Sequence, residues 1–536
     1  MLSNRFQSSS SADAPLPTRL INIKLPGQPF VEETGLDTRG PYVALSYAWG
    51  QGRRVTTGKA SYDSHKQRLP IDELPRTFAD AIHAARTLGY NYLWIDALCI
   101  IQDDQDDLGR ELARMGDIYR FASLTFDAQG AQSSHSGLLL DRDSRLLSPC
   151  KVTVSVTTAG GYVSRHELTL AITCNGPDYL ESRGWVLQER LLSSRRLLFG
   201  EQMTWICATA TARETRPVLH SKASSTRDDG DGSVLQRLRL CLIHPPTAIV
   251  EAVREPYRRP GPFDFWYAMV EKYSDKALTN PEDNLNALSG LAARFHEAQN
   301  ATYVAGLWRE DLEIGLAWYV GLNDERPVTS SAEVGPSWSW ASVGKVRVKF
   351  HSWRGSRGLV AGTGVRVLDV ASQTEVESNP FGRVIGGELT VQARPRKAIL
   401  EYSESYAAAR IEQCYGNMRR AFDGADATEH ARYPALILDA ETEEPVAEAA
   451  LDRPLLCGSS SLGDGVPDPR IVVWCVLLHS QRLGQGCRGT LLVLERCGNE
   501  RRHFSRLGLG FLGEAHASRF VAGGGAEMVD QALRIV

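Results

Sequence analysis

The chain has little of what marks a metal-binding or disulfide-stabilised protein. Its ten cysteines lie scattered between Cys99 and Cys497 without a Cys-x-x-Cys pair, and its twelve histidines do not cluster. A structural zinc site needs clustered thiols and imidazoles, so we predict no metal. Cys99, Cys207 and Cys475 lie inside apolar runs, which predicts buried and reduced thiols.

Long apolar runs are also absent. The longest obvious one, Ile471–Leu478, is far shorter than the roughly 20 residues of a membrane-spanning helix, so we predict a buried strand there. The start, Met1–Phe6, lacks the layout of a secretory signal. A net charge of -4 gives no electrostatic reason to expect nucleic acid or an anionic membrane as a partner. We therefore expect a cytoplasmic protein with neither kind of partner.

Familiar hydrolase signatures are missing too. The chain has no Gly-x-Ser-x-Gly nucleophile elbow and no His-Glu-x-x-His motif. Cys99 is a weak candidate nucleophile, because its apolar surroundings would raise the thiol pKa. Two Gly-x-Gly-x-x-Gly matches begin at Gly484 and Gly508, but neither has the chain context of a βαβ unit, so both are predicted to be turns.

The first part of the chain, from about Ile21 to Glu214, alternates apolar runs of strand length with helical patterns. Tyr42–Tyr47, Tyr92–Ile95 and Ser123–Asp127 are predicted strands. This alternation is typical of a doubly wound α/β fold with a parallel sheet.

Helices are predicted between these strands. One opens at Leu74-Pro75 and ends before Gly89, and another begins near Asp106 and Asp107, whose carboxylates favour the positive end of a helix. A less regular stretch then contains a β-like run, Lys151–Thr158. A further helix is predicted to start at Gly184.

The second half has a different character. Residues 1–20 are predicted to be a mobile tail, 21–216 the first domain, 217–261 a linker rich in turn formers, and 262–536 a C-terminal region that is first helical and then β-rich. Its candidate strands are Val346–Phe350, Leu389–Ala393 and Ile471–Leu478. Trp338 and Trp340, two residues apart, are predicted to be packing residues on one side of a strand.

Polar residues follow the predicted strands, where ligands collect in open α/β sheets. Asp96 follows one strand, and Trp185 and Glu189 are four residues apart, so they share a helix face. A carboxyl group pressed against an aromatic wall is desolvated, as in enzymes that cleave glycosidic bonds. Alternatively, Asp96 caps a turn and Glu189 pairs with neighbouring arginines.

Three segments in this order resemble the signature of the fungal heterokaryon-incompatibility (HET) domain. They are Tyr42–Gly50, Tyr92–Gln102 with its Trp-Ile-Asp and Leu-Cys-Ile, and Gly184–Ser193 with its Gly-Trp and Gln-Glu-Arg. The resemblance continues through Leu74–Phe78, Met115–Tyr119 and Pro336–Ala341, although Ala48 and Ile101 depart from commoner family forms.

The resemblance implies a role in fungal non-self recognition and cell death. The family is thought to be distantly similar to TIR domains, flavodoxin-like modules of which some cleave NAD, so it implies a TIR-like N-terminal domain. On that analogy Glu189 is the catalytic carboxylate, with NAD as substrate and no required cofactor. The residues implied to line the pocket are Ser46, Tyr47, Trp49, Asp96, Trp185 and Gln188.

Two other functions stay open at this point. The domain could be a non-catalytic adaptor that binds protein partners, or a stand-alone biosynthetic or regulatory protein that retains the fold. Protein partners, with self-association among them, are expected in either signalling role. The sequence contains no recognisable sensor repeat, and this absence keeps the stand-alone alternative open.

Overall fold

The computed structural model describes residues 14–536 apart from gaps at 36, 52–54, 143–146, 148–149, 158–159, 171–175, 208–209, 222–241, 243–260, 322–334, 345, 352–359, 378, 402–433, 444, 453–460, 463–465, 468–469, 484–485, 498–501 and 513–529. The chain divides into two compact units, residues 1–233 and 234–536. Most of the predicted linker 217–261 lies outside the described residues. So do residues 1–13 of the predicted tail, whereas Arg19 and Leu20 already belong to a strand.

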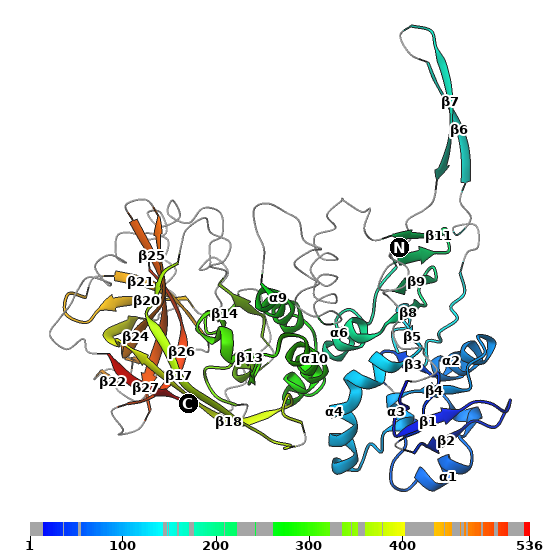
Figure 1. Cartoon of the computed structure of the whole chain (residues 1–536), viewed down its shortest axis with the longest axis horizontal. Coiled ribbons are helices and arrows are strands. Elements are labelled where there is room, and N and C mark those ends of the chain that lie inside the picture. Colours follow the sequence, from blue (N-terminus) through cyan, green and yellow to red (C-terminus); the bar gives the residue numbers. More distant parts are fainter. Residues whose placement is uncertain are drawn as a thin grey trace. The chain divides into compact units, whose positions relative to one another are not determined.

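The N-terminal unit contains a nine-stranded mixed sheet in the order β11-β10-β9-β8-β5-β3-β4-β1-β2 (Figure 1). Its four central strands pair in parallel: β4 (Tyr92–Trp94), β3 (Val43–Ser46), β5 (Leu124–Asp127) and β8 (Arg195–Leu198). The sequence-based predictions of β3, β4 and β5 are confirmed. These short strands are almost entirely buried, as expected for the centre of a parallel sheet.

Both edges of this sheet are antiparallel, so the prediction of a parallel sheet holds only for its centre. β1 (Arg19–Asn22) and β2 (Phe30–Glu33) extend it beside β4, and β9 (Thr204–Cys207), β10 (Ala210–Arg213) and β11 (Arg216–Ser221) extend it beyond β8. The links from β1 to β2 and from β8 through β11 are short, and a short link can join only antiparallel neighbours.

Three helices connect the parallel strands. They are α2 (Arg76–Thr87), α4 (Gln105–Phe121) and α6 (Gly184–Leu192). The shorter α1 (Tyr62–Gln67) and η2 (Ile71–Glu73) precede α2, and α3 (Asp96–Cys99) precedes α4. Because such connections are right-handed, α2 covers one face of the sheet while α4 and α6 cover the other, where they pack together. The Asp104 side chain caps α4 by accepting from the amides of Asp106 and Asp107.

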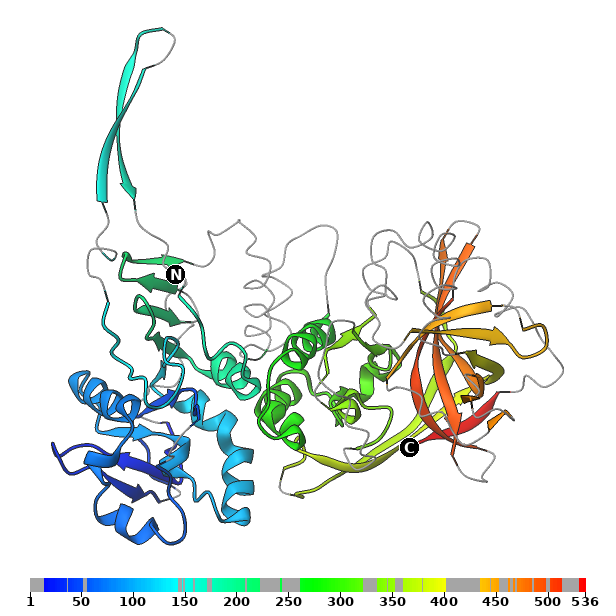
Figure 2. The same ribbon diagram turned by 180° about the vertical axis from the view of Figure 1, so that it is seen from behind.

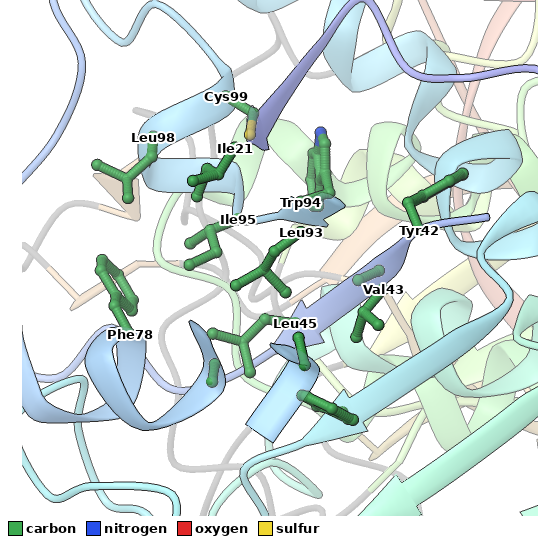
Figure 3. Packing of buried hydrophobic residues seen from close by; sticks show 14 of the residues in the cluster. Ile21, Tyr42, Val43, Leu45, Phe78, Leu93, Trp94, Ile95, Leu98 and Cys99 are labelled. Carbon is green, nitrogen blue, oxygen red and sulfur yellow. The ribbon is translucent and has the colours of Figure 1, made fainter. Parts of the chain in front are cut away.

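The core of this unit lies between the sheet and these helices. Figure 3 shows Phe78 from α2 and Leu98 and Cys99 from α3 packing on side chains of the central strands. On α2, the buried Phe78, Ile82 and Ala85 share one apolar face. Burying such side chains is the main favourable contribution to folding. The core therefore holds the central strands in place, and with them the polar residues at the strand ends.

A separate two-stranded ribbon interrupts the unit between β5 and α6. β6 (Cys150–Thr157) pairs antiparallel with β7 (Val163–Leu170), from Cys150 opposite Leu170 to Thr157 opposite Val163. The predicted β-like run at Lys151–Thr158 is therefore a strand, but it does not belong to the large sheet. Figures 1 and 2 show the ribbon extending away from that sheet.

The C-terminal unit opens with helices that carry its aromatic core. α9 (Pro262–Ser274) buries an apolar stripe at helical spacing that consists of Phe265, Trp266, Met269, Val270 and Tyr273. Further short elements follow: η4 (Pro281–Asn284), η5 (Asn286–Leu288), α10 (Ser289–Gln299), β12 (Tyr303–Val304), β13 (Leu307–Trp308), η6 (Arg309–Asp311), α11 (Leu312–Gly315) and β14 (Trp318–Val320).

Trp338 and Trp340 are buried packing residues, as predicted, but not in a strand. Trp340 begins the 3-10 helix η7 (Trp340–Val343), because the Ser339 side chain caps it through the Ala341 amide. The Trp340 indole N–H donates to the Gly306 carbonyl oxygen. Trp340 therefore ties η7 to the turn between β12 and β13.

The rest of the C-terminal unit is rich in β-strands. β15 (Val348–Phe350) pairs with β14, and a ten-stranded sheet contains β16 (Val360–Thr363), β17 (Val365–Thr374), β18 (Val384–Ala393), β19 (Arg396–Glu401), β20 (Pro434–Asp439), β21 (Pro445–Leu451), β24 (Arg470–Leu483), β25 (Gly486–Arg496), β26 (His503–Leu512) and β27 (Gln531–Ile535). β22 (Ser461–Leu462) and β23 (Val466–Pro467) form a separate pair.

Six of these strands close on themselves. β24, β19, β20, β21, β26 and β25 pair in that order, and β25 returns to β24. Their inward side chains form a second core that includes Leu400, Ile437 and Val473. Gly486 and Gly489 lie in β25 and Gly508 and Gly510 in β26, so the turn prediction is wrong for these four glycines. Gly484 and Gly513 lie outside the described residues. At Gly508 a Cβ atom would lie 2.2 Å from the Ala450 carbonyl oxygen, so the glycine permits close strand approach.

No helix in the described part of the chain is long and apolar enough to cross a membrane.

Candidate functional site

Three polar side chains lie where neighbouring parallel strands end. Ser46 ends β3, Asp127 ends β5, and the two residues are opposite each other in the strand pairing. Asp96 follows β4 and begins α3. Counted among the parallel strands alone, β4, β3, β5 and β8 stand in the order second, first, third, fourth, so the strand order reverses between β3 and β5. Ligands of open α/β sheets bind at such a switch point.

Asp96 joins the segments that follow β3 and β4. Its two carboxylate oxygens accept hydrogen bonds from the Tyr47 hydroxyl and the Trp49 indole N–H, each at 2.8 Å, and Oδ1 also accepts from the Ala97 amide at 2.7 Å. Burial raises the pKa of Asp96, and the hydrogen bonds from Trp49 and Tyr47 oppose that rise. The alternative that Asp96 caps a turn therefore accounts only for its bond from the Ala97 amide. The bonds from Tyr47 and Trp49 come from another segment.

The aromatic rings beside Asp96 form a small wall. Tyr47 stacks in parallel on Trp49 with ring centroids 6.4 Å apart, and its other neighbour is the edge-on ring of Phe78. Burial, followed by the charge of Asp96, holds the pKa of Tyr47 well above its usual range, so its hydroxyl stays protonated and remains a donor.

Glu189 lies on the inner face of α6, where its side chain is 6% exposed. Burial raises the pKa of Glu189 to about 7, with smaller upward contributions from the charges of Asp96 and Asp127. The Ser46 hydroxyl and the Arg183 guanidinium oppose the rise. Its Oε2 atom has no hydrogen-bond partner within the described residues. The result is a carboxyl group that can gain or lose a proton near neutral pH.

The other two predicted residues of α6 occupy different surroundings. Gln188 is fully buried, and Trp185 is half-buried and packs on the core of the N-terminal unit. Trp185 and Glu189 lie on one helix, at the four-residue spacing that places side chains on the same face.

The expected alternative of an ion pair between Glu189 and its arginine neighbours is wrong for Arg190 and Arg196. Arg190 Nη2 bonds Asp178 Oδ2 at 2.7 Å, and its Nε lies 3.7 Å from Asp127 Oδ2. Arg196 Nε donates to the same Asp127 oxygen at 3.0 Å. Adjacent helix residues point in different directions, so Arg190 turns away from Glu189.

Sequence reasoning missed two charged residues of this site. Asp127 is fully buried between Arg190 and Arg196, and it raises the pKa of Glu189. Its position at the end of a predicted strand was a usable signal. Arg183 donates to the Tyr47 carbonyl oxygen at 2.6 Å and lowers the pKa of both Glu189 and Asp96. It precedes the predicted helix, and only the tertiary fold brings it to the strand ends.

This arrangement places two carboxyl groups in unlike environments. Burial raises the pKa of both groups, but Asp96 accepts three donors, whereas one oxygen of Glu189 has no hydrogen-bond partner among the described residues. Two nearby carboxyl groups with different hydrogen-bond partners are the kind of arrangement that acid–base and glycosidic chemistry uses. Among the described residues, no three His, Cys, Asp or Glu side chains are arranged to hold a metal ion.

Comparison with known proteins gives one match. Residues 42–189 match the family model described as Heterokaryon incompatibility protein (HET). The matched range runs from β3 to Glu189, and it includes every residue of the candidate site that the sequence predicted. No curated protein and no solved structure matches the chain.

Proposed function

We propose that this chain, which carries a HET domain over residues 42–189, acts in a heterokaryon-incompatibility response by cleaving the nicotinamide–ribose bond of NAD at Glu189. The HET domain itself suggests a heterokaryon-incompatibility-type function. Non-self recognition and cell death as the outcome, and NAD as the substrate, belong to the proposal.

The single observation that carries the proposal is the state of Glu189. Its pKa is raised to about 7 by burial, and one of its oxygens has no hydrogen-bond partner in the described part of the chain, so a bound molecule can supply one. Cleavage of a glycosidic bond develops positive charge on the sugar, and an ionised carboxylate stabilises that charge. In its ionised form Glu189 would act on the ribose, while Tyr47 and Trp49 would position a planar ring.

The proposal extends to the fold and the cellular setting. The parallel strands follow the order of a flavodoxin-like sheet, which supports a TIR-like ancestry for the N-terminal unit. NAD would be the substrate, and no bound cofactor would be required. The chain would act in the cytoplasm with protein partners.

The test is nicotinamide release from NAD by the purified full-length chain. Glu189→Gln should lower the rate by at least about 100-fold, since a catalytic carboxylate contributes that much or more. Glu181→Gln is the matched control, because the Glu181 side chain is 59% exposed and pairs with Arg190 at the edge of the site. Equal release by the wild-type chain and the Glu189→Gln variant would exclude Glu189 as the catalytic group.

A second candidate function is a non-catalytic adaptor. It is favoured by the exposed apolar side chains of the β6–β7 ribbon, among them Val156 and Tyr162. Under this alternative, no nicotinamide is released at any protein concentration, and Glu189→Gln leaves the cellular response intact. Loss of that response in the Glu189→Gln variant alone would argue against it.

A further inference from the structure

The β6–β7 ribbon has open edges. Within the described residues β6 pairs only with β7, so the outer backbone groups of both strands meet no other strand. Open edges are templates for pairing with another chain, and natural proteins protect them with charges, prolines or bulges. A two-stranded ribbon alone is also only marginally stable in water. A further strand that pairs with either edge would extend the ribbon and stabilise it.

Within the described residues, Lys151 near the start of β6 is the one charged residue of this strand. From Val152 to Ser164 the chain has no charged residue and no proline. The pairing of β6 with β7 runs without a bulge over its full length. β7 differs, because it carries Arg165 and Glu167, and Glu167 pairs with Lys151 at 3.1 Å. The open edge of β6 is therefore the better suited of the two for pairing.

The two faces of the ribbon also differ. Alternation along β6 places Val152, Val154 and Val156 on one face, which is apolar along β6. Opposite these valines on β7 lie Leu168, His166 and Ser164, in that order. Lys151, Thr153 and Ser155 lie on the other face, with Arg165 and Glu167 of β7. Val156 and Leu168 are each 47% exposed, so the apolar face meets water. Large exposed apolar areas mark interaction sites.

We propose that β6 pairs antiparallel with β6 of a second copy of this chain, about a two-fold axis at Val154. This register places Val154 opposite Val154 of the other copy and Val152 opposite Val156, so valines meet valines. It also places Lys151 opposite Thr157, so like charges do not face each other. Both apolar faces then lie on the same side of a four-stranded sheet.

The size of this contact sets its strength. Stable interfaces bury about 1,200 Å² or more, and pairing of one short strand with its copy buries far less. The association is therefore reversible and depends on concentration. It differs from the proposed NAD cleavage, and neither requires the other.

Disulfide trapping tests the register. Directly opposed residues of an antiparallel pair have Cα atoms about 4.5–5.5 Å apart, within the range of a disulfide. In a full-length Cys150→Ser background, which removes the exposed thiol of β6, Val154→Cys should form a covalent dimer on mild oxidation. Ser155→Cys is the matched control, because its copy lies diagonally, about 7–8 Å away, and should cross-link far less. Equal cross-linking by both variants, or by neither, overturns the register.

Sedimentation of the full-length chain tests whether the valine face of β6 mediates self-association. The wild-type chain should associate reversibly as its concentration rises, and Val154→Lys should weaken that association at least tenfold. Thr153→Lys places the same charge on the polar face and should leave it unchanged. A wild-type chain that stays monomeric up to about 1 mM, or association that survives Val154→Lys, overturns the proposal. Circular dichroism of each variant confirms that the unit is folded.

Discussion

The Trp49 indole N–H donates a hydrogen bond of 2.8 Å to Asp96 Oδ2, which joins the segment after β3 to the segment after β4. Trp49 belongs to the segment Tyr42–Gly50 and Asp96 to the segment Tyr92–Gln102, so neither segment by itself predicts this bond. The bond holds the two segments together at the strand ends where Glu189 lies.

Replacing Trp49 by phenylalanine should cost about 1–3 kcal/mol of unfolding free energy, because a buried oxygen of Asp96 loses its donor. Urea unfolding of the N-terminal unit measures the loss. Trp205→Phe is the control, since it makes the same change in another half-buried ring of this core. A loss no larger in Trp49→Phe than in the control would mean that the bond to Asp96 contributes little.

Glu189→Gln should change how stability depends on pH. The folded pKa of about 7 lies above the ordinary 4.5, so the folded chain binds the extra proton and loses stability as pH rises from about 4.5 to 7. The variant lacks this loss, so at pH 8 it should be more stable than the wild type by up to about 3 kcal/mol, and at pH 4 nearly equal. Urea unfolding at both pH values measures the difference. An advantage for the variant at pH 4 only would reverse the expected sign.

His351 should make the C-terminal unit less stable as pH falls, whereas Glu189 makes the N-terminal unit less stable as pH rises. Burial, with the nearby His479, lowers the pKa of His351 from 6.5 to about 4, so the unfolded chain binds the proton more readily. Stability of this unit should therefore fall as pH drops from about 6.5 to 4, by up to roughly 3 kcal/mol before solvent screening of the half-buried ring is considered. Calorimetry across this range should show a flatter pH dependence for His351→Gln. An unchanged pH dependence would assign the acid sensitivity to other groups.

Gly50→Ala should strongly destabilise the site. Gly50 has a φ of +70°, and a Cβ atom there would lie 2.2 Å from the Ser133 Cβ. The backbone cost of about 1–2 kcal/mol adds to an overpacking cost of about 1–3 kcal/mol.

Gly27→Ala separates these two contributions. Gly27 has a φ of +74°, but a Cβ atom there meets nothing within 4 Å. This control should lose only the backbone part when unfolding free energies are compared in urea. Equal losses in the two variants would show that the contact with Ser133 relaxes without cost.

Local patterns predicted the centre of the N-terminal unit. β3, β4 and β5 are short apolar runs, and the helices α2 and α4 carry a 3.6-residue periodicity, so each signal lies within one segment. β8 was not predicted, because Arg195 and Arg196 give it no apolar run. The closed set of strands in the C-terminal unit was not predicted either. It depends on pairings such as that of Arg396 with Cys475, which no local pattern encodes.

The candidate site was predictable to a similar extent. The rule that ligands collect at strand ends pointed to Asp96, and the family resemblance added Ser46. The same rule applies to Asp127, which ends β5 opposite Ser46. The Trp185–Glu189 spacing predicted a desolvated carboxyl group, and burial does raise the pKa of Glu189. The contributions of Arg183 and Asp127 to this pKa could not be predicted, because both residues come from other segments.

The position of β27 has a consequence for the order in which the two units can form during synthesis. In the C-terminal sheet, β27 lies between β26 and β18, and its pairing puts Ile535 opposite Leu389. The ribosome therefore makes β18 long before the strand that must lie beside it, and until then one edge of β18 stays unpaired. The last strand of the N-terminal unit, β11, ends at Ser221, so that unit can fold while the second is still being translated.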